Sequence, residues 1–314
     1  MRFTLAGHRN PAHYLRMAPV HSQAEALAPV SGRRASRDWT SISLMIGPAF
    51  MISLLFFVVP MLVVLANSLS ATGSSDRMVF TFGNYLQELT DGFYWEVLGR
   101  TLWISAFTTA VALLLGYPAA LYLYFSKSRW RRVFLFIIVS PLFVSVIVRT
   151  YGWIILFSPN GPINALLPEG YKLRLLHTQY AIVIGLMHVY IPFMVLSLNA
   201  SMANIDKRLL TAAASLGASS YRIFRDVLFP LSLPGVLSGC IIVFSISMTA
   251  FTTPILLGGV KNKTTPYLIY QENLLLSRWG LGSALAFVLL LITLTIVFVL
   301  TRLTKRDHNQ VVLQ

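Results

Sequence analysis

Long apolar stretches alternate with shorter polar segments along the chain. Six stretches have about the 20 residues that a helix needs to cross the hydrocarbon core of a bilayer. They lie at 41–67, 101–125, 133–157, 179–200, 234–257 and 282–301. Backbone polar groups find no water in that core, so each stretch must bond to itself as a helix. The pattern therefore predicts an all-α membrane protein with about six transmembrane helices.

Composition strengthens this prediction. Only 11% of the residues are charged and 56% are hydrophobic, whereas about a quarter of the residues of a soluble domain are charged. The single cysteine, Cys240, excludes an internal disulfide. The net charge of +14 first has to be placed relative to the membrane.

The Lys and Arg residues predict the orientation, because they collect on the cytoplasmic side of membrane proteins. With the N-terminus inside, the polar segments 1–40, 126–132, 201–233 and 302–314 hold 17 of the 25 basic residues. The opposite loops hold seven, and Arg149 lies within a span. We therefore expect both termini in the cytoplasm, and nucleic-acid binding is not needed to explain the charge.

The segment 201–233 is longer than an ordinary connection and too polar to span a membrane. Its pattern predicts two short amphipathic helices, the first capped by Asn204 or Asp206 and ended by Gly217. We expect Ser219 or Ser220 to cap the second helix and Pro230 to stop it. Such a pair either lies on the lipid surface or docks into a groove of a partner protein, and the residues alone leave both readings open.

A spacing within this segment resembles the cytoplasmic loop of ABC-importer permeases. That loop reads Glu-Ala-Ala, three residues, Gly, nine residues and Ile-x-Leu-Pro. Here Thr211 replaces the Glu, and the matching positions are Ala212, Ala213, Gly217, Val227, Phe229 and Pro230. In the family the loop inserts into a cleft of the ATPase subunit. The resemblance implies an ATPase-coupling role for Asp206, Thr211, Ala212, Ala213, Gly217, Val227 and Pro230.

Four further motifs are similar to the spermidine/putrescine-type subfamily. They are Leu115-Gly116-Tyr117-Pro118, Val148-Arg149-Thr150-Tyr151, the run from Ser158 to Asn164, and Gly258-Gly259. The resemblance implies a permease subunit of a bacterial ABC importer, a multi-pass protein of the inner membrane that moves a polyamine such as spermidine or putrescine. An amino-acid derivative, a phosphonate or another anion is the alternative solute.

The same resemblance implies the domains and the partners. We expect a disordered basic cytoplasmic tail at 1–40, a transmembrane permease domain at 41–305 with its coupling loop at 201–233, and a cytoplasmic tail at 306–314. The implied partners are a second permease subunit, giving a heterodimer, a cytoplasmic ATPase dimer and a periplasmic solute-binding protein. The sequence has no phosphate-binding Gly-rich loop. We therefore expect no enzyme activity and no bound cofactor, with ATP and Mg used by the ATPase.

Polar side chains within the spans are candidates for the solute pathway. The spacing of Ser238, Ser245, Thr249 and Thr252 places them on one face of a helix. Such a stripe either lines a pathway or serves helix packing. Arg149 and Tyr151 are further candidates, because an ionisable residue within a span usually faces a cavity. Gly235 and Gly239 predict close helix packing, and a partner permease is one candidate for the neighbour.

Two other classes of protein remain as alternatives. A secondary transporter normally has inverted repeats and an intramembrane carboxylate, and we find neither in the sequence. A membrane-embedded enzyme needs a nucleophile with a base, or a metal cluster, and no motif joins the Ser, His and Cys residues in this way. We therefore assign no catalytic residue and no metal ligand.

Overall fold

The computed structural model describes residues 35–70, 80–168 and 170–311, with side chains from 46 to 302 within those ranges. Most of the expected cytoplasmic tail at 1–40 lies outside the described residues, as do residues 312–314. The chain divides into two units, one up to Val59 and one from Pro60 onward. Each is described by itself, and the following account concerns the second unit unless α1 is named.

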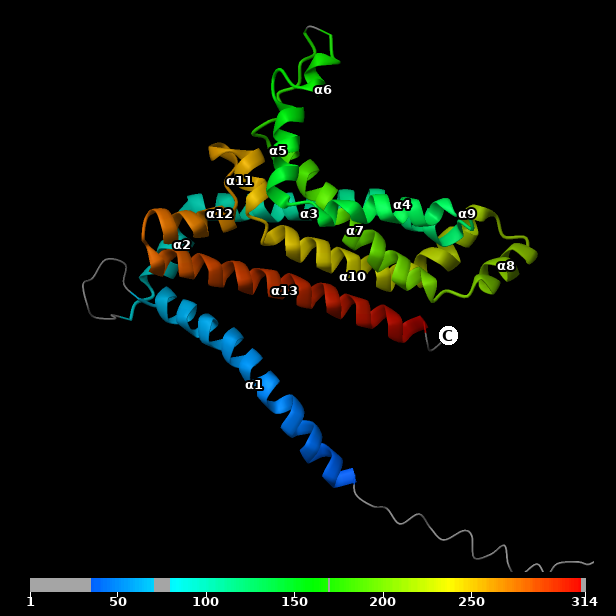
Figure 1. Ribbon diagram of the computed structural model, residues 1–314, viewed down its shortest axis with the longest axis horizontal. Coiled ribbons are helices and arrows are strands. Elements are labelled where there is room, and N and C mark those ends of the chain that lie inside the picture. Colours follow the sequence, from blue (N-terminus) through cyan, green and yellow to red (C-terminus); the bar gives the residue numbers. More distant parts are fainter. Residues whose placement is uncertain (1–34, 71–79, 169, 312–314) are drawn as a thin grey trace, which may run out of the picture. The chain divides into compact units, whose positions relative to one another are not determined.

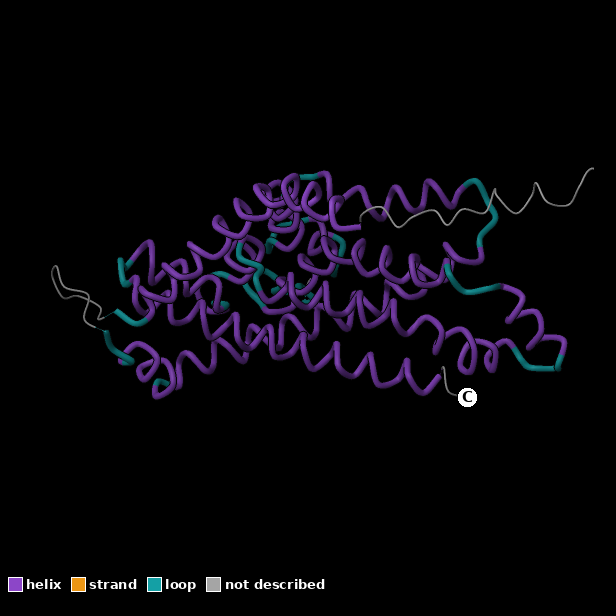
Figure 2. Tube along the Cα trace, turned by 90° about the horizontal axis from the view of Figure 1, so that it is seen from below, coloured by secondary structure: helices purple, strands orange, loops and turns teal. Residues whose placement is uncertain are grey.

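The described part of the chain is nearly all helix, as Figure 2 shows. Outside the helices, the described residues form one isolated bridge, between Ser70 and Phe80. The α-helices, labelled in Figure 1, are α1 (Ala35–Ser68), α2 (Gly83–Thr90), α3 (Gly92–Phe125), α4 (Trp130–Val139), α5 (Val146–Phe157), α6 (Pro162–Ala165), α7 (Gln179–Ala203), α8 (Lys207–Ser215), α9 (Ser220–Arg222), α10 (Phe229–Met248), α11 (Thr252–Gly258), α12 (Thr265–Tyr270) and α13 (Trp279–Val311). Short 3₁₀ turns lie at Ser140–Phe143 and Val260–Asn262, and π-helical turns at Ile223–Leu228 and Gln271–Leu275.

Five helical segments of the described chain are long and apolar enough to cross a membrane, and a bent pair makes a sixth. The five are Ile46–Ser68, Gly92–Phe125, Gln179–Ala203, Ser220–Met248 and Trp279–Arg302. The expected fold class, an all-α membrane protein with about six spans, is confirmed. Two of the six spans differ from the expectation, the third in its direction and the fifth in its bounds.

The third expected span, 133–157, is not one straight helix. The two halves, Trp130–Phe143 and Val146–Ala165, meet at an angle of 100°. The chain becomes extended at Val144 and Ser145, and the Arg149 guanidinium donates a hydrogen bond back across this break to the carbonyl of Pro141. In Figure 1, α5 accordingly points across the direction in which α3, α7, α10 and α13 run. Length and hydropathy count apolar residues but do not record such a change of direction.

The fifth span begins earlier and ends earlier than the expected 234–257. It is helical from Ser220 to Met248, so Pro230 does not stop a helix as predicted. Proline lacks an N–H and crowds the carbonyl one turn before it. The π-helical turn Ile223–Leu228 lies directly before Pro230, and its wider turn lets the helix continue into α10.

Helices α3, α7 and α10 form the core of the second unit by packing against one another. Fully buried side chains from all three meet there, among them Ala112 and Ala120 of α3, Met194 and Leu198 of α7, and Val243 of α10. Glycines permit the close approach. A Cβ on Gly116 of α3 would lie 2.9 Å from the Met194 Cγ of α7.

The Gly235 and Gly239 pair of α10 faces α7 of the same chain rather than a partner. A Cβ on Gly235 would lie 2.5 Å from the Ser201 Cβ, and one on Gly239 would lie 2.6 Å from the Met194 Sδ. The small residues therefore allow two helices to approach closely, as their spacing predicts. The neighbour is the chain's own preceding span.

A second region of packing joins α2, α3, α12 and α13. Tyr94 and Val97 of α3 are buried there against Leu268 of α12 and Leu281 of α13. The hydroxyls of Thr101 and Thr265 lie 3.1 Å apart and link α3 to α12. This region lies at the end of the unit opposite to α8 and α9 (Figure 1).

Two carboxyl groups are buried in this second region. Glu88 of α2 is 7% exposed and Glu272 is 6% exposed. Burial raises the pKa of the Glu88 carboxyl to about 7. The pKa of the Glu272 carboxyl is also raised by burial, although Arg278, 3.8 Å away, and Lys263 oppose this. The sequence did not predict that these two carboxyls are buried, because neither residue belongs to a motif.

We predict that Glu88→Gln removes part of the pH dependence of stability. The folded state raises the pKa of this carboxyl above its unfolded value of about 4.3, so the native chain binds the extra proton. Its stability is therefore highest below the unfolded pKa and falls as the pH rises to about 7. Thermal unfolding in detergent between about pH 5 and about pH 8 should show a smaller decline in Tm for the variant. The exposed Glu96 provides the control variant Glu96→Gln, and equal declines in both variants would contradict the assignment.

We predict that Gly235→Ala destabilises the folded chain, by about 1–3 kcal/mol as for other overpacked sites. The new Cβ meets the Ser201 Cβ at 2.5 Å and the Leu198 Cα at 3.2 Å, and a backbone atom cannot move aside cheaply. The matched control is Gly99→Ala on α3, where a Cβ meets nothing within 4 Å. Thermal unfolding should give a lower Tm for the first variant only, and the same Tm for both would refute close packing of α7 on α10.

Candidate functional site

The segment between α7 and α10 contains the first of the two short helices expected at 201–233, whereas the second is continuous with the fifth span, which is helical from Ser220 to Met248. The first, α8, begins after Asp206, whose carboxylate accepts a hydrogen bond of 2.9 Å from the Arg208 N–H. A cap of this kind satisfies one of the donors that the first turn of a helix leaves free. Of the two expected caps, Asp206 serves α8, and Asn204 instead ends α7.

The end of α8 explains the spacing of Ala213 and Gly217. The Ala218 N–H donates to the Ala213 carbonyl at 3.1 Å, and the Gly217 N–H donates to the Ala214 carbonyl at 3.0 Å. This pair of bonds is the Schellman arrangement, which needs a left-handed residue after the helix. Gly217 has a φ of +82°, a conformation that costs glycine little.

The second half of the segment starts at Ser219, whose hydroxyl accepts a hydrogen bond from the Arg222 N–H at 3.4 Å. Its inner face is anchored to α3. The ring of Phe224 meets the ring of Tyr117 edge to face at 5.8 Å, and Leu228 is buried. The Tyr117 hydroxyl lies 2.8 Å from that of Ser232, so this helix and α3 are joined by both apolar and polar contacts.

Lys207, at the start of α8, provides a second attachment to α3. Its ammonium donates a hydrogen bond of 3.0 Å to the Tyr124 carbonyl and lies 4.8 Å from the centre of that ring. The Tyr124 hydroxyl in turn donates to the Ile205 carbonyl at 3.3 Å. The two ends of the segment are thus fixed to one helix, and the turn at Gly217 lies farthest from these anchors in the sequence.

Apolar side chains are exposed between these anchors. The exposed fractions are 50% for Leu209, 89% for Leu216 and 69% for Tyr221. Exposed apolar side chains on a polar segment make it a candidate surface for a partner. We refer to residues 204–230 as the coupling segment, after the role that the resemblance implies.

The remaining predicted coupling residues lie on this segment with different exposure. Thr211, in the position of the family's acidic residue, is exposed, and its hydroxyl donates to the Lys207 carbonyl at 3.2 Å. Ala212 and Pro230 are exposed, while Val227 is half-buried. The carboxylate of Asp226, an acidic residue near the end of this segment, lies 3.9 Å from the guanidinium Nε of its neighbour Arg225. The ATPase-coupling role of the set stays a prediction.

Ser238 and Ser245 of the expected polar stripe share one face of α10, and Thr249 directly follows the last residue of that helix. Ser238 and Thr249 are exposed and Ser245 is half-buried. The Ser238 hydroxyl lies 2.6 Å from that of Ser197 on α7, while Ser245 donates to the Ile241 carbonyl at 2.7 Å. The stripe is therefore compatible with both interpretations, helix packing and pathway lining. Its hydroxyls form hydrogen bonds to helices, and part of its face is exposed.

Thr252 does not belong to the same helix as Ser238 and Ser245. Helix α10 ends at Met248, and Thr252 begins the separate helix α11 after a break at residues 249–251. The expected stripe of four on one helical face is therefore wrong in its last member. Spacing alone cannot reveal a helix end that has neither proline nor glycine at the break.

Arg149 and Tyr151 lie on α5, beyond the bend of the third span. The Arg149 guanidinium is bound to the Pro141 carbonyl, and its Nε is buried without a hydrogen-bond partner. Tyr151 is 55% exposed. Arg149 therefore stabilises the bend, a role that its place within an apolar stretch did not indicate.

Two further tyrosines of the spans, Tyr190 and Tyr122, have different surroundings from Tyr151. Tyr190 is buried, with its hydroxyl 3.5 Å from the Ile246 carbonyl. Tyr122 is 45% exposed and meets Phe134 edge to face at 4.8 Å. Of the three, Tyr151 and Tyr122 have ring surface available for a solute or a partner.

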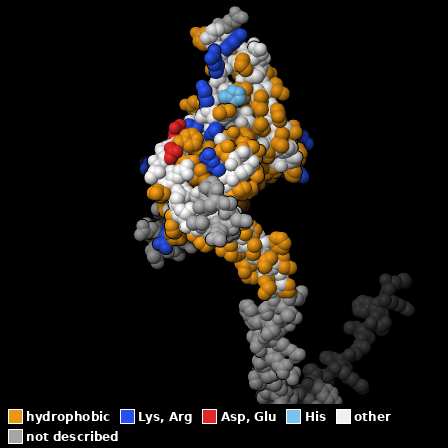
Figure 3. All heavy atoms as spheres, turned by 90° about the vertical axis from the view of Figure 1, so that its left-hand side faces the viewer, with side chains coloured by type: hydrophobic (Ala, Val, Ile, Leu, Met, Phe, Trp, Pro, Cys, Tyr) orange, Lys and Arg blue, Asp and Glu red, His pale blue; other side chains and the backbone are white. Residues whose placement is uncertain are grey.

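Asn164 organises the loop after α5. It is 3% exposed, and its amide donates to the Ser158 and Leu173 carbonyls while its oxygen accepts from the Leu173 N–H. A hollow of about 580 Å³ lies beside it and is lined in part by Lys172, Arg174 and His177. Figure 3 shows Lys and Arg side chains, together with hydrophobic ones, on the part of the molecule that contains α5 and α6.

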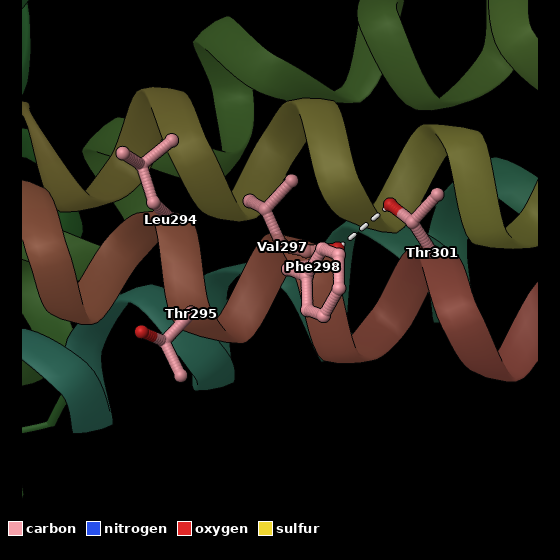
Figure 4. A pocket seen from close by; sticks show the side chains of 5 residues that line it. All are labelled: Leu294, Thr295, Val297, Phe298 and Thr301. Carbon is pink, nitrogen blue, oxygen red and sulfur yellow. Dashed lines mark hydrogen bonds between the residues drawn. The ribbon is translucent and has the colours of Figure 1, made fainter.

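A further hollow, of about 510 Å³, lies along α13 (Figure 4). Leu294, Thr295, Val297, Phe298 and Thr301 line it, and the Thr301 hydroxyl donates to the Val297 carbonyl at 2.7 Å. Its lining comes from one helix and is mainly apolar, so it offers no polar group that is free to orient a solute. Among the described residues, no group of three His, Cys, Asp or Glu side chains is placed to hold a metal ion.

Comparison with known proteins identifies the family. The family described as binding-protein-dependent transport system inner membrane component matches residues 112–306. The spermidine/putrescine transport system permease protein PotB of Haemophilus influenzae is 33% identical over 268 residues, which cover 83% of this chain and 93% of that protein. PotB of Escherichia coli is 32% identical over 266 residues, covering 83% and 96%.

A solved structure has the same fold. The crystal structure of a bacterial ABC transporter involved in the import of the acidic polysaccharide alginate contains a chain that superposes with a TM-score of 0.71 at 18% identity, covering 86% of this chain and 96% of that one. The family match covers more than half of the sequence and includes α4 to α12 completely, together with the second part of α3 and most of α13. This chain therefore belongs to the binding-protein-dependent transport system inner membrane components and is a multi-pass permease subunit of an ABC importer.

Proposed function

We propose that this permease carries a polyamine such as spermidine or putrescine across the inner membrane of a bacterium. The observation that supports this most is the identity of 32–33% with spermidine/putrescine permeases over 83% of the chain. Each match also covers more than nine-tenths of the relative's own length, so the similarity includes the spans and the coupling segment.

The proposed energy source is a separate cytoplasmic ATPase dimer that uses ATP and Mg, because this chain supplies no phosphate-binding loop. In this proposal the exposed Leu209, Leu216 and Tyr221 of the coupling segment lie in the groove of the ATPase. Closure of the ATPase then moves α8, and the anchors at Lys207 and Phe224 pass the movement to α3. A short segment held at both ends is a suitable lever because it moves as one body.

The proposed assembly has two further components. A periplasmic binding protein delivers the solute, and a second permease subunit completes the pathway as a heterodimer. The partly uncovered hydroxyl stripe of Ser238, Ser245 and Thr249 then faces the pathway between the two subunits. The chain itself acts as a transport subunit with no cofactor of its own.

An anionic solute is the second candidate. The putative 2-aminoethylphosphonate transport system permease protein PhnU of Salmonella choleraesuis is 26% identical over 204 residues, covering 62% of this chain. Arg149, at the bend of the third span, favours an anion over a cation in its vicinity. The lower identity and coverage place this candidate behind a polyamine.

Reconstitution tests the solute and the energy source together. We expect ATP-dependent uptake of radiolabelled spermidine or putrescine into proteoliposomes that contain this chain, its second permease, its ATPase and its binding protein. Uptake should stop without the ATPase. Equal uptake by the permease chain alone would overturn the importer mechanism, whereas ATP-dependent uptake of 2-aminoethylphosphonate in place of polyamines would select the second candidate.

We predict that Gly217→Val uncouples ATP hydrolysis from uptake. A residue with a Cβ pays roughly 1–2 kcal/mol for the left-handed conformation that ends α8. A Cβ meets nothing within 4 Å at this position, so the effect arises from the backbone and not from a clash. Gly217→Asn is the matched control, since Asn tolerates this conformation. Uptake per ATP hydrolysed should fall for Val and be kept for Asn, with membrane insertion intact in both, and unchanged coupling in the Val variant would refute the role of the turn.

A further inference from the structure

The short connection between α3 and α4 forms a basic hollow that the transport mechanism does not use. Its volume is about 600 Å³. The connection itself lies at the end of the unit where α8 and α9 are found (Figure 1). The lining side chains are those of Ser126, Lys127, Ser128, Arg129, Arg131, Arg132 and Leu135. Four of these seven residues are cations, and all four are exposed.

The cations of this hollow have no acidic partner. Ion pairs among the described residues join Arg100 to Glu96, Arg225 to Asp226 and Arg278 to Glu272, and none includes a residue of the α3–α4 connection. The sequence from Ser126 to Val139 contains no Asp or Glu. Four like charges around one hollow create a positive potential there that attracts anions. The charge therefore calls for an anionic occupant.

The surroundings of the hollow are apolar and exposed, as in a membrane interface. Phe125 at the end of α3 is 54% exposed, and Trp130 at the start of α4 is 63% exposed. Farther along α4, Phe136 and Ile137 are 68% and 60% exposed. Trp at the boundary between a polar loop and an apolar helix is typical of the headgroup level of a bilayer.

The hydroxyl groups of the connection shape its backbone. The Ser126 hydroxyl accepts a hydrogen bond of 3.3 Å from the Ser128 N–H, and the Ser128 hydroxyl accepts one of 3.2 Å from the Trp130 N–H. These bonds hold the turn so that its cations surround one hollow. Tyr124, whose carbonyl binds the Lys207 ammonium, lies just before this connection in the chain. The hollow is therefore beside the first turn of α8.

We propose that this hollow binds the phosphate headgroup of an anionic phospholipid, with the acyl chains lying along the exposed apolar face of α4. A basic loop that only determines the orientation of the protein in the membrane needs no such arrangement. Here the charges line one hollow, and an exposed apolar surface continues from it along α4. Basic pockets between membrane helices recognise lipid phosphates in this way. The proposal does not depend on which solute is transported.

Lipid retention by the purified full-length chain tests the proposal. Native mass spectrometry and thermal unfolding are recorded after titration with cardiolipin and, separately, with phosphatidylcholine. We expect cardiolipin to stay bound and to raise Tm, with no such effect of phosphatidylcholine. The double variant Arg131→Gln/Arg132→Gln should bind cardiolipin about tenfold more weakly or worse.

Two control variants separate the site from general charge effects. Lys172→Gln/Arg174→Gln removes the same charge from the other basic hollow and should leave cardiolipin binding unchanged. Arg131→Lys/Arg132→Lys keeps the charge and should keep most of the binding, which also shows that the connection still folds. Equal loss in the Lys172/Arg174 variant would overturn the proposal.

The same measurements exclude other occupants. Inorganic phosphate should not reproduce the rise in Tm given by cardiolipin, and an equal rise would show that the hollow binds free phosphate and not lipid. If Arg131→Gln/Arg132→Gln lost binding of the ATPase while retaining cardiolipin fully, the connection would be an ATPase contact and the lipid proposal would be wrong.

Discussion

The close contact of α7 with α3 and α10 is the constraint on which the rest of the second unit depends. Helices in lipid gain little from burying apolar surface against each other, so their association relies on close packing. Small residues provide it here, since Gly116 of α3 and Gly239 of α10 both face the Met194 side chain of α7. The coupling segment connects α7 to α10, and the hydroxyl stripe lies on α10, so both features take their positions from this contact.

The coupling segment combines a fixed base with a free tip. Its base is attached to α3 through Lys207 at one end and through Phe224 and Ser232 at the other. Between them the backbone turns at Gly217, where local hydrogen bonds alone determine the conformation. The exposed apolar side chains lie on this free part, so a partner can bind there without displacing any packing of the core.

Polar groups inside this apolar chain serve the fold in several ways. Arg149 binds a backbone carbonyl across the bend of the third span, and Thr101 joins α3 to α12. Glu88 is buried near the opposite end from the coupling segment, where its raised pKa makes the local packing sensitive to pH. The membrane-spanning unit is thus held by apolar contacts along its length and by a few polar contacts at its breaks.

Features encoded within a few neighbouring residues were accessible from the sequence. The apolar lengths predicted the spans, because hydrocarbon thickness sets how many residues a helix needs. The spacing of Ala213 and Gly217 predicted the end of α8, and of the two candidates for its cap Asp206 is the correct one. These signals are local because a cap, a left-handed turn and a span each depend on one short stretch of backbone.

Contacts between distant residues were decided by the tertiary structure alone. The 100° bend of the third span, the separation of Thr252 from α10 and the continuation of the helix through Pro230 also appear only in the structure, because apolar length and spacing carry no signal for them. The partner of Gly235 was likewise undetermined, because its spacing requires a close neighbour without saying which one, and the folded chain supplies Ser201 of α7. The sequence by itself determined the number of spans and the two ends of α8, whereas only the fold decided the directions and neighbours of the helices, since these depend on residues far apart in the chain.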